Sequence, residues 1–483
     1  MLKAQGGQSK CCQSLLGSSL VDGVPDTVLS ELTLTKLPIH SLGIVTMVCV
    51  KLLKCANVLI LKIAGSMLLN LRAKESPASL VFAIRVMKSL PYSIMARRDY
   101  QSQEVSDASE FKVKSFGCGS HGQLGHPCPQ TGPCYLRREP QKVVDLCGEH
   151  VVQVAAGFEH TLVLTQDGKV FGFGNAINGE LGHGNPCKYK QYIPYKAWSL
   201  DDENIVQVAA GAHHSVVLTA CGEVFTFGSG CKGKLGHGCI NSEYSPRKVH
   251  ALVGKNIIQV AAGSGHTVVL ADNGDVFAFG NVPGNSQTTP YKVESLSGER
   301  VVQVAAGDEI SAALTSHGEV IMFGVGCYLK NVLLEKKNMF AVKMPAGEHI
   351  VQVALGAEHF AFVTHKGKLF TFGKGHTGRL GHDLEFIGHN REVHEADLYF
   401  PKQVDALRGI HVKQVALGGD HSVALTKGGR VYTFGRSHYG QLGHGLHAGD
   451  YECPPRIMDK LLHDRVFQIA AGGDHTLVLC RPR

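Results

Sequence analysis

The segment Val152-Gln-Val-Ala-Ala-Gly157 is the first of seven related copies along this chain. After it come His160, an apolar run, a tight turn and the aromatic-glycine element Val170-Phe-Gly-Phe-Gly174. A spacing of 44 to 62 residues separates the glutamines of successive copies, which are Gln153, Gln207, Gln259, Gln303, Gln352, Gln414 and Gln468. Self-similarity at such a period is typical of repeat domains, in which neighbouring units bury each other's apolar faces.

The two ends of the array complete one unit between them. The last copy stops after His475-Thr-Leu-Val-Leu479, without the turn and strand that follow in the other copies. A matching strand stands at the front of the array, as Phe111-Lys-Val-Lys-Ser-Phe-Gly117. We therefore expect the strand near Val113 to pair with the one near Leu477 and to close the array into a ring.

One unit contains four predicted strands. Ile205-Val-Gln-Val-Ala-Ala-Gly211 ends in small residues, which let backbones approach closely near the axis of a radial assembly. The run from His214 to Thr219 lacks alternation, which predicts burial on both faces. Cys221-Gly222 makes the next turn, and Pro246 marks an outer strand, where its missing N–H breaks no ladder bond. Seven such units predict an all-β, seven-bladed β-propeller of residues 111–483.

Residues 1–110 precede the array, and we predict a partly helical or disordered N-terminal extension there. Its stretch from Gly43 to Leu69 is strongly apolar, but Lys51, Lys54 and Lys62 interrupt it. A membrane-spanning helix needs about 20 residues nearly free of charge. A spanning or anchoring helix is therefore the less favoured alternative to a helix packed on the ring or a disordered extension, and we expect no membrane partner.

Composition points to an intracellular protein without a strong charge signal. The net charge of +7 includes +4 from residues 1–110, which leaves little on the array to favour nucleic acid or chromatin as a partner. The chain has 15 cysteines, an odd number, and no Cys-x-x-Cys pair. Free thiols are typical of a reducing compartment, so we expect a cytoplasmic or nuclear location.

The repeat itself carries a family resemblance. The order Ala-Ala-Gly-x-x-His, apolar strand, Gly turn, Val-Phe-x-Phe-Gly and Leu-Gly-His-Gly resembles the regulator of chromosome condensation (RCC1)-like family of propellers. The resemblance implies a ring in which an N-terminal strand completes the final blade. Two blades depart from the pattern: those after Gly280 and Gly324 lack Leu-Gly-His, and one Gly-x-x-His reads Gly307-Asp-Glu-Ile310.

The repeated histidines favour a structural role over a catalytic one. Six stand in Gly-x-x-His and five in Leu-Gly-His, and we expect each to bond a backbone group in its own blade. Cys118, His121, His126, Cys128 and Cys134 match no zinc spacing closely, so we expect no metal and no cofactor. No phosphate-binding loop or hydrolase motif occurs, so the chain is not expected to be an enzyme.

Acidic residues directly before the repeat histidines are the first candidates for partner binding: Glu159, Glu358, Asp420 and Asp474. The founding member of the resembled family is a guanine nucleotide exchange factor for a small nuclear GTPase, and it acts through loops of this kind. The resemblance therefore implies an acidic rim on one face. The alternative is that these carboxylates only stabilise local turns.

Two further stretches are candidates. Residues 383–400 lengthen one loop and contain Glu385, Arg391 and Glu392, and long loops on rigid scaffolds often carry specificity. The stretch from Lys188 to Trp198 interleaves lysines with aromatics, which suits base stacking or an acidic partner, or simple packing on a blade edge.

We therefore predict a non-catalytic protein-interaction propeller, for example one that recruits a partner for ubiquitin ligation. The alternative prediction is a guanine nucleotide exchange factor for a small GTPase of the Ran type.

Overall fold

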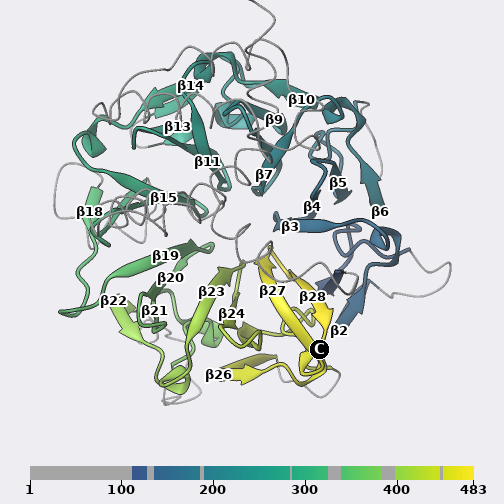
Figure 1. Cartoon of the computed structure of the whole chain (residues 1–483), viewed down its shortest axis with the longest axis vertical. Helices are drawn as coiled ribbons and strands as arrows, with labels where there is room; N and C mark the ends of the chain where they lie inside the picture. The colour runs from purple at the N-terminus through teal and green to yellow at the C-terminus, as the bar shows by residue number, and fades with distance from the viewer. Residues whose placement is uncertain are drawn as a thin grey trace, which may run out of the picture. The chain divides into compact units, whose positions relative to one another are not determined.

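A computed structural model describes residues 111–127, 135–184, 190–282, 285–324, 339–382, 398–445 and 450–483. These residues belong to one compact unit and form seven four-stranded antiparallel sheets. The first strand of each sheet points towards the centre of a ring, and the fourth lies at its rim (Figure 1). The predicted all-β, seven-bladed propeller is therefore confirmed.

The strands of each blade follow the chain from the axis outwards in six of the seven sheets. The first three of these six blades are β3 (Val151–Ala156), β4 (His160–Thr165), β5 (Val170–Gly174) and β6 (Gln191–Lys196); β7 (Ile205–Ala210), β8 (His214–Thr219), β9 (Val224–Gly228) and β10 (Glu243–Lys248); and β11 (Ile257–Ala262), β12 (His266–Ala271), β13 (Val276–Val282) and β14 (Asn285–Lys292). The next three are β15 (Val301–Ala306), β16 (Ile310–Thr315), β17 (Val320–Gly324) and β18 (Met339–Ala341); β19 (Ile350–Leu355), β20 (His359–Thr364), β21 (Leu369–Gly373) and β22 (Leu398–Gln403); and β23 (Val412–Leu417), β24 (His421–Thr426), β25 (Val431–Arg436) and β26 (Tyr451–Ile457).

The closing blade joins both ends of the array. Its order is β27 (Asp464–Ala471), β28 (His475–Pro482), β1 (Lys112–Cys118) and β2 (Leu136–Lys142). Strand β1 runs antiparallel to β28, with Lys112 opposite Cys480 and Gly117 opposite His475. The C-terminus accordingly lies beside β2 (Figure 1), and the predicted ring closure is confirmed.

Short 3-10 helices complete the blades. Most follow an outer strand: η1 (Val144–Leu146), η2 (Trp198–Leu200), η4 (His250–Leu252), η5 (Glu294–Leu296), η8 (Asp405–Leu407) and η9 (Asp459–Leu461). Two others, η3 (Cys231–Gly233) and η7 (His376–Gly378), lie in loops between third and fourth strands. No helix among the described residues is long and apolar enough to cross a membrane, and Gly43 to Leu69 lie outside those residues.

The core lies between adjacent blades. Every residue of the second strand β4 is buried, as its unbroken apolar run predicts, whereas the outer strand β10 alternates in exposure. Leu162 and Val170 of one blade pack with Val217 and Phe227 of the next. Each blade thus buries its faces only by having two neighbours, which is why an open array would leave apolar surface exposed.

A ring of glutamines ties the first strands together. The Gln153 side chain donates to the Val208 carbonyl (3.1 Å) and accepts from the Val208 N–H (2.9 Å) in the next blade. The same repeat glutamine bonds the following blade at every position around the ring. Gln468 closes the series by accepting from the Val154 N–H at 3.0 Å.

The Gly-x-x-His histidines form a second ring, and their predicted partners were wrong. Each Nε2 lies within hydrogen-bond distance of a Ser or Thr hydroxyl in the next blade, not of a backbone group in its own. These pairs are His160–Ser215, His214–Thr267, His266–Ser311, His359–Ser422, His421–Thr476 and His475–Thr161. The histidines are nevertheless structural, as their repetition indicated.

Donor counting fixes the tautomer of His160. The Ser215 hydroxyl donates its single hydrogen to the Glu180 carbonyl (2.6 Å), so His160 must donate from Nε2. Its Nδ1 atom is then a buried acceptor without a hydrogen-bond partner among the described residues. Burial lowers the pKa of His160 and of His475 to about 3, so both imidazoles are neutral in the folded protein.

At one interface between blades, both partners of this hydrogen bond are replaced. Ile310 replaces the histidine, and Phe360 replaces the hydroxyl residue of the next blade. Both side chains are buried and belong to one apolar cluster. Replacing both partners with apolar groups leaves no polar atom unsatisfied, so the interface keeps its packing.

The Leu-Gly-His histidines bond within their own blade, again to side chains. His126, His237, His382 and His444 lie 2.8 to 2.9 Å from a third-strand Ser or Thr hydroxyl. In the remaining blade, Gly172 occupies the hydroxyl position, and His183 packs against the Tyr195 ring at 4.5 Å.

Candidate functional site

One face of the propeller carries the acidic candidates. In six of the seven blades, the residue after the third-strand glycine donates its N–H to the carbonyl of the residue before the repeat histidine. Arg436 donates to Asp420 at 2.9 Å, and Cys118 donates to Asp474 at 2.8 Å. This bond places the side chain after the glycine beside the acidic side chain, so the two residue types together set the local charge.

Two of the four acidic candidates have cationic partners. Glu358 forms an ion pair with Lys374. Asp420 lies 3.1 Å from Arg436 and 2.8 Å from Arg379, whose side chain is only 1% exposed. These two carboxylates therefore stabilise their own loops, in agreement with the alternative prediction that they only stabilise local turns.

Glu159 has weaker partners. It accepts from the Asn175 amide at 2.8 Å and lies 3.4 Å from the His121 Nδ1 atom. Burial lowers the pKa of His121, and it outweighs the opposing effect of Glu159. At neutral pH the imidazole is therefore uncharged, so it does not compensate the negative charge of the Glu159 carboxylate.

Asp474 has no cationic partner among the described residues. The position that holds Arg436 in the preceding blade holds Cys118 here, and the Gln441 amide lies 3.4 Å from the Asp474 carboxylate. Burial is the main cause that raises the pKa of Asp474, and nearby Asp420 and Glu159 add to it against Arg436. Asp474 is thus a half-buried carboxylate without an ion pair among the described residues, and the attraction of Arg436 and His438 offsets its burial only in part.

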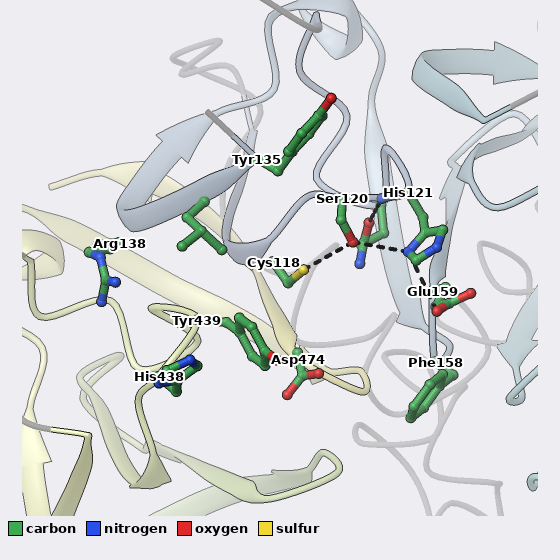
Figure 2. Close-up of a pocket in the computed structure, with 12 residues that line it drawn as sticks. Cys118, Ser120, His121, Tyr135, Arg138, Phe158, Glu159, His438, Tyr439 and Asp474 are labelled. Atoms are coloured by element: carbon green, nitrogen blue, oxygen red, sulfur yellow. Dashed lines mark hydrogen bonds and ion pairs between the residues drawn. The ribbon is translucent and has the colours of Figure 1, made fainter. Parts of the chain in front are cut away.

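Glu159 and Asp474 both line a cavity of about 400 Å³, which the closing blade, the blade of β3 to β6 and the loop between β25 and β26 form together. Figure 2 shows His121, Glu159 and Phe158 on one side, with Tyr439 and His438 on the other and Asp474 between them. The Cys118 thiol lies 3.2 Å from the Ser120 hydroxyl, which lies 3.0 Å from His121. Arg138 lines the opposite end, so the cavity has one acidic and one basic side.

Apolar side chains are exposed on the same face. Phe158 is 49% exposed, Ile177 53% and Ile240 64%, and all three lie in loops that open onto it. Large apolar side chains beside a polar cavity are typical of protein-binding surfaces. Phe158 was not among the residues predicted from the sequence, although it stands where the other copies have Ala, Ser, Asp or Gly.

The remaining candidates are not brought to this cavity. Glu385, Arg391 and Glu392 lie outside the described residues. Trp198 begins η2, and its side chain is outside the description. Within the same stretch Lys196 lies 2.8 Å from Asp201, and Tyr195 packs on His183, in agreement with packing on a blade edge.

The described residues contain no group of three or more side chains that could hold a metal ion. Cys128 and Cys134 of the weak zinc pattern lie outside those residues. His126, another member, bonds the Ser115 hydroxyl at 2.9 Å as part of the repeat.

Comparison with known proteins gives the family. A family model described as the RCC1-like domain matches residues 112–478. The chain is 32% identical over 374 residues to the E3 ubiquitin-protein ligase HERC2 of Mus musculus, which covers 76% of this chain but 6% of HERC2. It is 31% identical over 380 residues to the ultraviolet-B receptor UVR8 of Arabidopsis thaliana, covering 78% of this chain and 72% of UVR8.

Solved structures agree on the fold. Prp20p from Saccharomyces cerevisiae, a protein studied for its binding to Gsp1p and histones, superposes with a TM-score of 0.68 at 22% identity, covering 80% of this chain and 94% of Prp20p. Human WBSCR16 gives a TM-score of 0.65 at 23% identity, covering 77% and 99%. With a family match over most of its length and a closed ring of seven blades, the chain belongs to the RCC1-like domain family.

Proposed function

We propose that this propeller is a non-catalytic protein-interaction module that binds a partner at the cavity between Glu159 and Asp474. The observation that carries the proposal is the Asp474 carboxylate, which has no ion pair among the described residues, beside an exposed Phe158. A lysine or arginine of the partner would supply to Asp474 the charge that Arg436 supplies to Asp420. The Phe158 and Tyr439 rings lining the cavity would add cation–π attraction for such a side chain.

The relatives support a recruiting role. HERC2 is named as an E3 ubiquitin-protein ligase, HERC3 and HERC4 are named as probable ones, and this chain matches only a small part of each. We therefore propose recruitment, in which the propeller would select a protein for a separate ligase component. The seven described cysteines that are free thiols support a cytoplasmic or nuclear setting for this role.

A guanine nucleotide exchange factor for a small GTPase is the second candidate. Two observations favour it: acidic residues occupy the loops before the repeat histidines, and the similar fold of Prp20p belongs to a protein studied for Gsp1p binding. The same fold also makes histones or chromatin a partner class to include. An exchange factor must distort the nucleotide site of its partner, so it needs more than an acidic cavity.

Affinity capture with chemical cross-linking and mass spectrometry tests the first proposal. The full chain would be compared with Asp474→Asn and with Glu358→Gln, which neutralises the same repeat position where Lys374 already compensates it. We expect specific partners to be lost with Asp474→Asn and kept with Glu358→Gln. Equal recovery of every partner with both variants would contradict the cavity as the binding site.

Release of labelled GDP from a panel of small GTPases separates the two candidates. The interaction module predicts no acceleration by the wild-type chain at concentrations that saturate partner capture. Catalytic acceleration that is lost with Asp474→Asn would establish the exchange factor instead.

A further inference from the structure

The opposite face of the propeller carries an unusual pair of cations in the closing blade. Arg465 on β27 lies directly opposite Arg481 on β28. Their guanidinium carbons lie 5.4 and 5.2 Å from the centroid of the Phe467 ring, so both cations sit against one aromatic side chain. Phe111 packs edge-on against the same ring at 5.4 Å. Like charges directly opposite on neighbouring strands are unfavourable, so this pair does not serve the stability of the sheet.

Further cations surround the pair. Lys427 and Arg430 flank the turn between β24 and β25, and a Cβ atom at Gly429 would lie 3.0 Å from the Arg465 side chain. Arg483 donates to the Gly428 carbonyl at 3.2 Å, which fixes the same turn against the closing blade. Lys413 is exposed on β23, at the repeat position that Phe467 occupies on β27. We call Lys413, Lys427, Arg430, Arg465 and Arg481 the basic turn patch.

The basic turn patch lacks compensating carboxylates. None of its five members forms an ion pair with another described residue. The nearest acid in the sequence, Asp464, is buried and lies 2.6 Å from Lys114. The patch is therefore a concentration of positive charge that no carboxylate among the described residues neutralises.

Other blades show that this arrangement is not a property of the repeat. The position of Arg430, directly after the turn glycine, holds a charged residue in five other blades, and in four of them that residue forms an ion pair. Lys169 lies 2.9 Å from Asp167, Glu223 lies 2.6 Å from Lys248, and Lys368 lies 2.7 Å from Glu348. Arg430 has no such partner among the described residues, so it is the one of the three cations at this position, Lys169, Lys368 and Arg430, without an ion pair there. The acidic Glu319 at the same position of another blade has no ion pair among the described residues either.

We propose that the basic turn patch docks an acidic peptide segment of a partner protein. Carboxylates fit both the paired guanidiniums and the exposed lysines, and binding would relieve the repulsion between Arg465 and Arg481. A short acidic peptide fits better than a nucleic acid, because the next blade presents Glu149 and Asp167 on the same face. Lys169 offsets one of these two negative charges, and the other would repel a longer polyanion. The Phe467 ring is already covered by the guanidiniums, so it offers no free face for stacking a base.

This surface is separate from the Glu159 and Asp474 cavity, so the inference does not depend on the proposed function. Fluorescence anisotropy with a labelled hexaglutamate peptide tests it on the full chain. We expect binding that weakens with added salt and falls at least tenfold in the double variant Arg465→Gln, Arg481→Gln. The control Arg408→Gln, Arg456→Gln removes the same charge from residues paired with Asp405 and Glu452, and it should change the affinity less than twofold.

Thermal unfolding of the double variant should match or exceed that of the wild type, because the substitutions remove a like-charge pair. Equal peptide affinity in all three proteins would overturn the proposal. Tighter binding of a single-stranded RNA hexamer or of phosphatidylserine vesicles, lost in the same double variant, would overturn the assignment of an acidic peptide. Peptide binding that emerges only after Glu104, Asp107 and Glu110 are replaced by neutral residues would show that the chain's own acidic stretch is the occupant.

Discussion

The blade of β23 to β26 and the closing blade carry the same acidic position in different electrostatic settings. In the first, Asp420 lies between Arg436 and Arg379. In the second, Asp474 faces Cys118, and burial raises its pKa. The backbone bond that sets the geometry is the same in both, so the difference comes only from the side chain that follows the third-strand glycine. The repeat thus fixes where a carboxylate lies, and the neighbouring strand decides whether it is available to a partner.

The difference arises where the chain closes the ring. In a continuous blade the residue that pairs with the acid stands 16 positions later, as Lys374 follows Glu358 and Arg436 follows Asp420. For Asp474 that residue comes from β1, at the opposite end of the array. Closure between two distant segments therefore places Cys118, and not a cation, beside this carboxylate.

The largest expected effect comes from removing half of the closing blade. Deleting Val466 to Arg483 removes most of β27 and β28. Strand β1 then loses its pairing with β28, and Val154 and Thr161 of the next blade lose their hydrogen bonds to Gln468 and His475. Unpaired strand edges and exposed apolar surface should cause aggregation instead of a folded monomer. Size-exclusion chromatography and thermal unfolding would measure this. A monomeric product with an unchanged melting temperature would contradict closure by these strands.

Acid should destabilise the ring through the buried histidines that join neighbouring blades. Burial lowers the pKa of His421 and His266 to about 4 and of His475 to about 3, whereas an unfolded histidine titrates near 6.5. As the pH falls, the unfolded chain therefore takes up protons before the folded protein does. The free energy of unfolding has its full value above pH 6.5 and falls as the pH drops towards 4. Each such histidine contributes a loss of up to about 1.4 kcal/mol per pH unit.

Urea unfolding at pH 7.5, 6.5 and 5.5 would measure this loss. A double variant His266→Ile, Ser311→Phe copies the natural Ile310 and Phe360 pair. On unfolding, this variant should take up as much as one proton fewer than the wild type does, because it has one buried histidine fewer. An unfolding free energy that stays constant between pH 7.5 and 5.5 would show that the buried histidines do not control acid stability.

The interface without a histidine tests whether the histidine and the hydroxyl at the other interfaces act as a pair. Ile310→His would bury an imidazole opposite Phe360, with no hydroxyl to accept its proton. The lost apolar packing and the unpaired donor should lower the free energy of unfolding by about 2–4 kcal/mol. Adding Phe360→Ser should recover part of that loss, measured as a favourable coupling of about 1 kcal/mol in a double-mutant cycle. An additive double variant would mean that the histidine and hydroxyl do not act as a pair.

A smaller effect is expected from Cys118→Arg, which copies Arg436 into the closing blade. The new ion pair with Asp474 is half-buried, so it should raise the free energy of unfolding by only about 0.5–1 kcal/mol. The same variant should lose the partners that depend on Asp474, because its charge is then satisfied internally. Unchanged partner capture with a confirmed ion pair would show that Asp474 is not the recognition group.

Much of this architecture could be predicted from the sequence, because each strand type has its own local signal. Gly turns, Pro140 in β2 and the unbroken apolar second strands identify the blade, and the staggered ends identify closure. The histidine partners could not be predicted, since the Ser or Thr that each bonds stands 45 to 63 residues away in the next blade, and 314 residues away for His475. The available carboxylate was also hidden, because Glu159, Glu358, Asp420 and Asp474 share one repeat position and differ only in what faces them.

The most direct test of this account is the pKa of the Asp474 carboxyl group. It can be followed by carbon-13 NMR of aspartate-labelled protein, with the Asp474→Asn variant identifying the resonance. The account predicts a pKa above the ordinary value of about 3.9 in the wild type, and a pKa at least about 1 unit lower in Cys118→Arg. An ordinary or depressed pKa that Cys118→Arg leaves unchanged would contradict the claim that ring closure leaves this carboxylate without an ion pair among the described residues.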